Sequence, residues 1–143
     1  MNHRFATIPI LAALLLAPIF AIGCAVQGRP FEKASSPPGN AVIYVYRPYN
    51  YASSLLKPAV TCGGESASIG PGGYHAFVVP AKHTVECTVE TETADQVEIH
   101  AEPRTYYIKE DFGWGVLRGH PHLNPIDADQ AQTEIQSCCV LEN

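Results

Sequence analysis

The sequence predicts an all-β protein, a small antiparallel β-sandwich with a short C-terminal helix. Short segments rich in β-branched and aromatic residues recur along the chain, and Gly or Pro clusters separate them at intervals typical of sandwiches and barrels. The 143 residues include 12 Pro and 11 Gly, which disfavours a helical bundle or a coiled coil. This length fits one domain and is short for two.

Before the first expected strand lies an uncharged apolar stretch, residues 8–22, which follows a weakly cationic start with Arg4. It is too short to span a bilayer as a helix and matches the apolar core of a signal peptide. The tetrapeptide Ala-Ile-Gly-Cys at residues 21–24 comes next and resembles the bacterial lipobox. In lipoproteins with that motif the cysteine Sγ receives a diacylglycerol, the leader is cleaved before it, and the new amine receives a fatty acid such as palmitate. We therefore expect a signal peptide over residues 1–23 and a lipid on Cys24.

The residue after the expected lipidation site indicates a destination. In enteric-type bacteria an Asp there is the usual signal for retention in the inner membrane, and this chain has Ala25. The resemblance therefore implies an outer-membrane lipoprotein that faces the periplasm. The alternative is an ordinary secretory leader in which Cys24 is incidental.

Residues 25–40 read AVQGRPFEKASSPPGN, with no apolar periodicity. Such a segment buries too little surface to offset its ordering entropy. We therefore predict a lipidated N-terminus and flexible tether over residues 24–40 and a β-sandwich domain over residues 41–143. A chain shortened to begin at Asn40 is then expected to unfold at nearly the same temperature.

The clearest strand is predicted over residues 41–47, because Val-Ile-Tyr-Val-Tyr is β-branched and aromatic and Pro48 stops it. Alternation places Ile43 toward the core and Tyr44 on the opposite face, which is core if it is covered and a binding platform if it is open. The further strands are expected at residues 59–62, 74–79, 84–92, 96–101 and 104–109. A helix over residues 128–136 is expected to begin after Asp127 as its N-cap.

The order of several motifs resembles a family of small bacterial lipoproteins catalogued as domain of unknown function 2846. The motifs, all in residues 41–112, are Val-Ile-Tyr-Val-Tyr-Arg-Pro, Cys-Gly-Gly, Gly-Tyr, Val-Pro-Ala-Lys-His-Thr and Thr-Tyr-Tyr-Ile. Members usually have Gly where this chain has Ala81, which indicates an altered turn. The resemblance implies a β fold and an envelope location, and it brings no activity.

Four cysteines remain after Cys24, and an oxidising periplasm favours disulfides among them. Cys62 and Cys87 share strand parity with core-facing valines, so we expect a Cys62–Cys87 bridge. A bond between the adjacent Cys138 and Cys139 needs a strained ring. Two alternatives remain open: each core cysteine pairs with a tail cysteine, or the tail forms intermolecular bonds.

The sequence offers little catalytic chemistry. His120 and His122 would share the face of a strand, but no Cys-x-x-Cys or His-x-x-x-His spacing accompanies them, so we expect no metal site. The Glu and Asp residues between 86 and 98 alternate along strands and are expected to form a solvated face. No nucleophile elbow and no phosphate-binding loop is present, so we expect neither catalytic residues nor a cofactor.

The net charge of −5 argues against nucleic-acid binding, which needs a basic face. The sequence therefore predicts a membrane-anchored, non-catalytic structural or interaction module of the bacterial envelope, whose partner is an envelope protein or polymer. The alternative is a binding module for a sugar, a peptide or a metal, and an enzyme ranks last.

Overall fold

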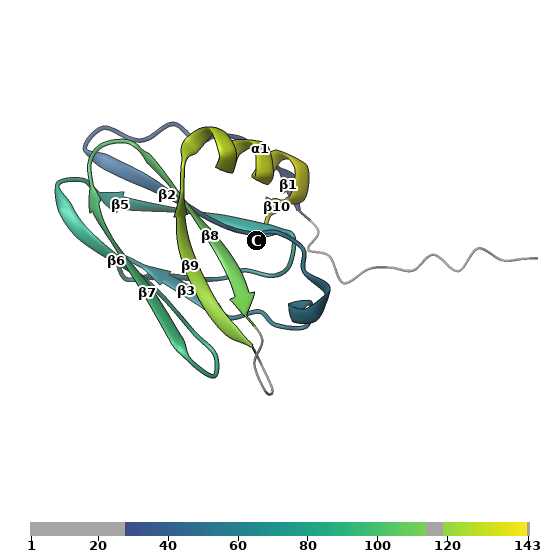
Figure 1. The fold of residues 1–143 in the computed structure, drawn as a ribbon. Coiled ribbons are helices and arrows are strands. Elements are labelled where there is room, and N and C mark those ends of the chain that lie inside the picture. Colours follow the sequence, from purple (N-terminus) through teal and green to yellow (C-terminus); the bar gives the residue numbers. More distant parts are fainter. Residues whose placement is uncertain (1–27, 114–118, 143) are drawn as a thin grey trace, which may run out of the picture.

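The computed structural model describes residues 28–113 and 119–142. Its strands are Arg29–Pro30 (β1), Asn40–Arg47 (β2), Ala59–Cys62 (β3), Glu65–Ser68 (β4), Gly73–Pro80 (β5), His83–Glu90 (β6), Ala94–Ala101 (β7), Thr105–Gly113 (β8), His120–Ile126 (β9) and Val140–Leu141 (β10). One sheet has the order β1-β10-β5-β2-β8-β9 and the other β4-β3-β6-β7. The two sheets form separate layers, and the helix α1 (Ala128–Cys138) lies over the larger one (Figure 1). The predicted all-β sandwich is confirmed.

Two strand pairings in the larger sheet are parallel, although the sequence predicts an antiparallel sandwich. β2 pairs with β8 in parallel, and β5 pairs with β10 in parallel. A parallel pair needs a long connection. Between β2 and β8 the chain supplies one by crossing to the smaller sheet twice, first for β3 and β4 and then for β6 and β7.

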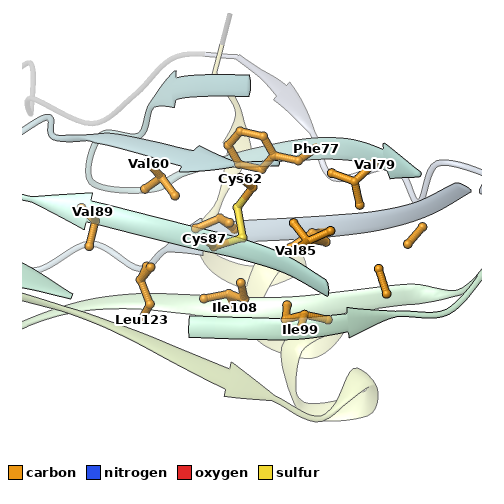
Figure 2. Packing of buried hydrophobic residues seen from close by; sticks show 14 of the residues in the cluster. Val60, Cys62, Phe77, Val79, Val85, Cys87, Val89, Ile99, Ile108 and Leu123 are labelled. Carbon is orange, nitrogen blue, oxygen red and sulfur yellow. A yellow bond between two sulfur atoms is a disulfide. The ribbon is translucent and has the colours of Figure 1, made fainter. Parts of the chain in front are cut away.

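The main core lies between the two sheets. Ile43 on β2 points into it and is fully buried, as the alternation predicts. The other buried members come from both layers, and Figure 2 shows most of them: Ala41, Val45, Val60, Cys62, Ile69, Phe77, Val79, Val85, Cys87, Val89, Ile99, Ala101, Ile108 and Leu123. Burial of these side chains is the main favourable term in the stability of the domain.

The opposite face of the larger sheet is also core. Tyr44 and Tyr46 are buried there, with Ala131 and Ile135 of α1 in the same cluster. The Tyr44 ring stacks on Tyr107 with centroids 5.4 Å apart. The tyrosine face is therefore covered rather than open, which removes it as a platform for a ligand.

The helix begins where the sequence predicts. The Asp127 side chain accepts hydrogen bonds from the backbone N–H groups of Asp129 and Gln130, each at 3.1 Å. The Gln130 side chain donates to Glu134 at 2.8 Å. Only the aspartate half of a capping box is therefore formed.

The prediction of a flexible tether over residues 24–40 is wrong for the part that the structure describes. β1 pairs with β10, so Arg29 and Pro30 already belong to the larger sheet and the folded unit does not begin at residue 41. The Phe31 ring then packs edge-on against Tyr44 and Tyr74, with centroids 5.3 and 5.4 Å apart. Aromatic edge-to-face contacts of this kind add stability beyond the area they bury. A single Phe in a polar segment gives no periodic signal, which is why the sequence does not predict that β1 and Phe31 pack against the larger sheet.

Shortening the chain to begin at Asn40 should therefore destabilise the domain, which reverses the expectation from the sequence. Loss of β1 and Phe31 uncovers the rings of Tyr44 and Tyr74. The single change Phe31→Ala should lower the free energy of unfolding by about 2 kcal/mol, below the 3–5 kcal/mol of a fully buried Phe, because Phe31 is half-buried. Thermal and urea unfolding followed by circular dichroism measure both effects, with the exposed Lys33→Ala as control. An unchanged midpoint in both altered chains would show that β1 and Phe31 contribute nothing to the stability of the domain.

Candidate functional site

The cysteines form two disulfides within the described residues. Cys62 and Cys87 lie directly opposite each other on β3 and β6, with Cα atoms 4.1 Å apart and the sulfurs bonded. Figure 2 shows this bridge crossing two neighbouring strands inside the core. The bridge is therefore structural, because its sulfurs are shielded from solvent and from any reactant. Cys24, the predicted lipidation residue, lies outside the described residues.

The second disulfide differs from the expectation. Cys138 and Cys139 are joined to each other, although the sequence argument disfavoured a bond between neighbours. Neither core cysteine is left to pair with the tail. β10 holds the tail instead, because its backbone pairs with β1 on one side and with β5 on the other.

His120 and His122 lie on β9, where His122 is exposed and His120 is half-buried. Across the described ranges, no three His, Cys, Asp or Glu side chains gather as a set of metal ligands.

The acidic side chains on β6 and β7 do not all point the same way. Glu86 and Glu98 face each other on the outer side of β6 and β7. Asp95 instead accepts a hydrogen bond from the Leu123 N–H at 2.7 Å and so joins the two sheets.

A groove of about 530 Å³ lies beside the N-terminus of α1, with Arg104 and Tyr106 in its wall. The Arg104 guanidinium lies over the Tyr106 ring, 4.8 Å from the centroid. The Asp127 carboxylate already binds the N–H groups that begin the helix. The groove therefore presents an acid where an anion would otherwise bind.

The most unusual chemistry lies where β2 ends. Arg47 follows Ile43 and Val45 on the core-facing side of the strand, and its side chain is only 1% exposed. Its Nη1 donates to the carbonyls of Leu56 and Ile69 at 2.7 and 3.2 Å, and its Nη2 donates to that of Ser53 at 2.6 Å. A buried guanidinium thus anchors the β2–β3 loop, residues 48–58, to the end of the sandwich.

Glu110 on β8 is a second buried ionisable residue, also 1% exposed. Neither carboxylate oxygen has a hydrogen-bond partner among the described residues. Burial raises the pKa of Glu110 from 4.5 to about 8, and the nearby Arg47 opposes this rise. Asp111 and Glu142 raise it further, so the carboxyl is largely protonated near neutral pH.

Glu110 should make stability dependent on pH. Because its pKa is higher in the folded chain than in the unfolded chain, its contribution is complete below pH 4.5 and is lost as the pH rises through about 8. Glu110→Gln should therefore flatten the fall in unfolding free energy between these values and stabilise the domain by about 2 kcal/mol at pH 9. Urea unfolding across this range measures the effect. Glu98→Gln on β7 is the control, because Glu98 is exposed and is not among the groups that act on Glu110. Parallel curves for wild type and Glu110→Gln would contradict the assignment.

The β2–β3 loop presents apolar side chains to solvent. Tyr49, Tyr51 and Leu55 are 49%, 85% and 87% exposed. The sequence predicts no strand or helix between the strands at residues 41–47 and 59–62, and the prediction includes neither the anchor nor the exposed tip of this loop. Strand parity carries a signal for the anchor, because it places Arg47 on the same side as Ile43. The exposure of the tip has no comparable signal in the sequence.

No family model, curated protein or solved structure matches the chain. The resemblance to the lipoprotein family therefore stays a prediction. No helix in residues 28–113 and 119–142 is long and apolar enough to cross a bilayer.

Proposed function

We propose that the protein is a lipoprotein of the bacterial cell envelope, anchored through Cys24, whose β-sandwich serves as a non-catalytic structural or interaction module. The single observation that carries this proposal is the sequence Ala-Ile-Gly-Cys at residues 21–24, directly after an uncharged apolar run. In a lipobox the cysteine occupies the one position where thioether formation and cleavage act together. Several acyl chains on one residue give stable anchoring, since each buried CH₂ contributes about 0.8 kcal/mol.

The use of the buried polar groups supports a non-catalytic role. The Arg47 guanidinium is engaged with loop carbonyls, and the Glu110 carboxyl is closed off from solvent. Catalytic acids and bases must instead reach a substrate in a cleft. The described cysteines are all oxidised, so none supplies a thiolate nucleophile.

The alternative function is the binding of a sugar, a peptide or a metal, and for a sugar or a peptide it relied on an open tyrosine face. Tyr44 and Tyr46 lie under α1 and Phe31, so they offer no surface to a sugar or a peptide.

Metabolic labelling in bacteria tests the anchor. Labelled palmitate should enter the wild-type chain, while Cys24→Ser should lose the label and fail to reach the outer-membrane fraction. Ala25→Ser, the same kind of change one residue later, should keep the label. Ala25→Asp should also keep it but move the protein to the inner membrane, because an acid at this place signals retention. Wild-type protein without label would refute the proposal, and hydrolysis of envelope polymers by the purified protein would refute the non-catalytic role.

A further inference from the structure

Exposed apolar side chains concentrate at one place on the described surface. Among the described residues four large hydrophobic side chains are exposed, and three of them, Tyr49, Tyr51 and Leu55, belong to the β2–β3 loop, while the fourth, Val78, lies on β5. Scattered single residues of this kind are ordinary on soluble proteins, whereas a group on one loop marks a contact surface.

The loop is held in place before any contact is made. Two of its backbone carbonyls, those of Ser53 and Leu56, accept hydrogen bonds from the Arg47 guanidinium. The Asn50 side chain accepts from the Ala52 N–H at 3.0 Å and caps the 3₁₀ turn η1, Tyr51–Ser53. The Ser53 carbonyl also accepts the Leu56 N–H at 3.0 Å. A surface that is fixed in advance loses little entropy on binding.

The first described residue lies against the C-terminal strand β10, and the residue after that strand contacts this loop. Gly28 lies against the Leu141 carbonyl at the outer edge of the larger sheet. Glu142, the residue after Leu141, forms an ion pair with Lys57 of the loop, with Nζ and Oε1 2.8 Å apart. Four residue steps separate Gly28 from Cys24, so the lipidated cysteine of the proposed function lies within about 14 Å of Gly28. This end of the sandwich therefore stays close to the bilayer surface.

We propose that the β2–β3 loop inserts Tyr51 and Leu55 into the headgroup region of a phospholipid bilayer, as a second membrane contact beside the lipidated Cys24. This inference rests on the proposed function. Tyrosine suits the membrane interface because its ring is apolar and its hydroxyl is polar, and leucine supplies apolar area.

Size and charge favour lipid over a protein partner. A stable protein interface buries about 800 Å² on each side, which three side chains on one loop do not supply. A membrane contact needs less, because it adds only a second signal to an existing anchor. The acidic outer positions of β6 and β7, among them Glu86 and Glu98, belong to the other sheet. The loop can thus approach anionic lipid while the acidic outer face of β6 and β7 does not contact the bilayer.

Photocrosslinking of the full-length protein in bacterial membranes tests this proposal. Tyr51, Leu55 and, as a control, His83 are each replaced by benzoylphenylalanine. His83 is exposed and follows the turn at the far end of β5, away from the Gly73 end that adjoins Arg47. After illumination, mass spectrometry identifies the adducts. Phospholipid adducts should form at positions 51 and 55, several-fold above position 83.

The outcomes separate the two proposals. Membrane-bound protein without lipid adducts at positions 51 and 55, or with equal adducts at 83, overturns the loop contact and leaves the anchor standing. Protein adducts at 51 and 55 overturn it in favour of a protein partner. Protein that is absent from the membrane fraction refutes the anchor, and the loop proposal falls with it.

Discussion

Replacing Ile43 by Asp is expected to abolish the cooperative unfolding transition of the domain. Ile43 is fully buried between the two sheets, on a strand that pairs with β5 on one side and β8 on the other. An unpaired carboxylate in that place costs several kcal/mol, either as a buried charge or through its protonation. Domains have only about 5–15 kcal/mol of stability to lose. Thermal and urea unfolding by circular dichroism should show no sigmoidal transition.

Two control variants show whether the loss of stability comes from the buried charge, from the smaller side chain or from a carboxylate at any position. Ile43→Val removes one methylene group and should cost about 1 kcal/mol while the transition stays cooperative. Thr84→Asp places the same carboxylate on the exposed side of β6, opposite His100, and should leave the midpoint nearly unchanged. A normal transition in Ile43→Asp would contradict the burial of this side chain between the two sheets.

Removing the core disulfide should have the next largest effect. The double change of Cys62 and Cys87 to Ala opens a loop with a sequence separation of 25 residues. In the chain-entropy model this lowers the free energy of unfolding by about 3 kcal/mol. Alanine is preferred over serine because both positions are fully buried and a hydroxyl there has no partner. Urea unfolding measures the change.

The second disulfide provides a matched control. Cys138 and Cys139 are adjacent, so their bond closes no chain loop and restricts the unfolded state little. Changing both to Ala should therefore cost clearly less than the core pair. Equal losses from the two double variants would contradict the chain-entropy account. Peptide mapping that links Cys62 to Cys138 or Cys139 would contradict the pairing itself.

The sequence predicted the features that depend on local alternation. The direction of Ile43, the facing of Cys62 and Cys87 and the Asp127 cap all follow from neighbours within a few residues. These are positions where backbone geometry alone decides which way a side chain points.

The features that the sequence did not predict depend on distant partners. β1 and β10 have two residues each and exist only because they pair with each other and with β5. β9 contains Pro121 and Pro125, which demote a segment in any strand pattern, and it forms at the edge of its sheet, where proline is tolerated.

The candidate site likewise combines features that local sequence predicts with features that depend on distant partners. Parity places Arg47 in the core, but its carbonyl partners on Ser53, Leu56 and Ile69 come from turns whose positions no pattern gives. The rise in the pKa of Glu110 likewise depends on burial by strands far away in the sequence. A charged residue at an inward strand position is therefore the signal to look for in similar chains.

The intact mass of the mature protein, purified from bacterial membranes, tests the central claim most directly. A lipoprotein anchored at Cys24 should have lost residues 1–23 and should carry a diacylglycerol on Sγ together with an amide-linked acyl chain. Its first residue should then resist Edman degradation, because its amine is blocked. An unmodified chain with a free N-terminal amine, or one that begins after Cys24, would contradict the anchor.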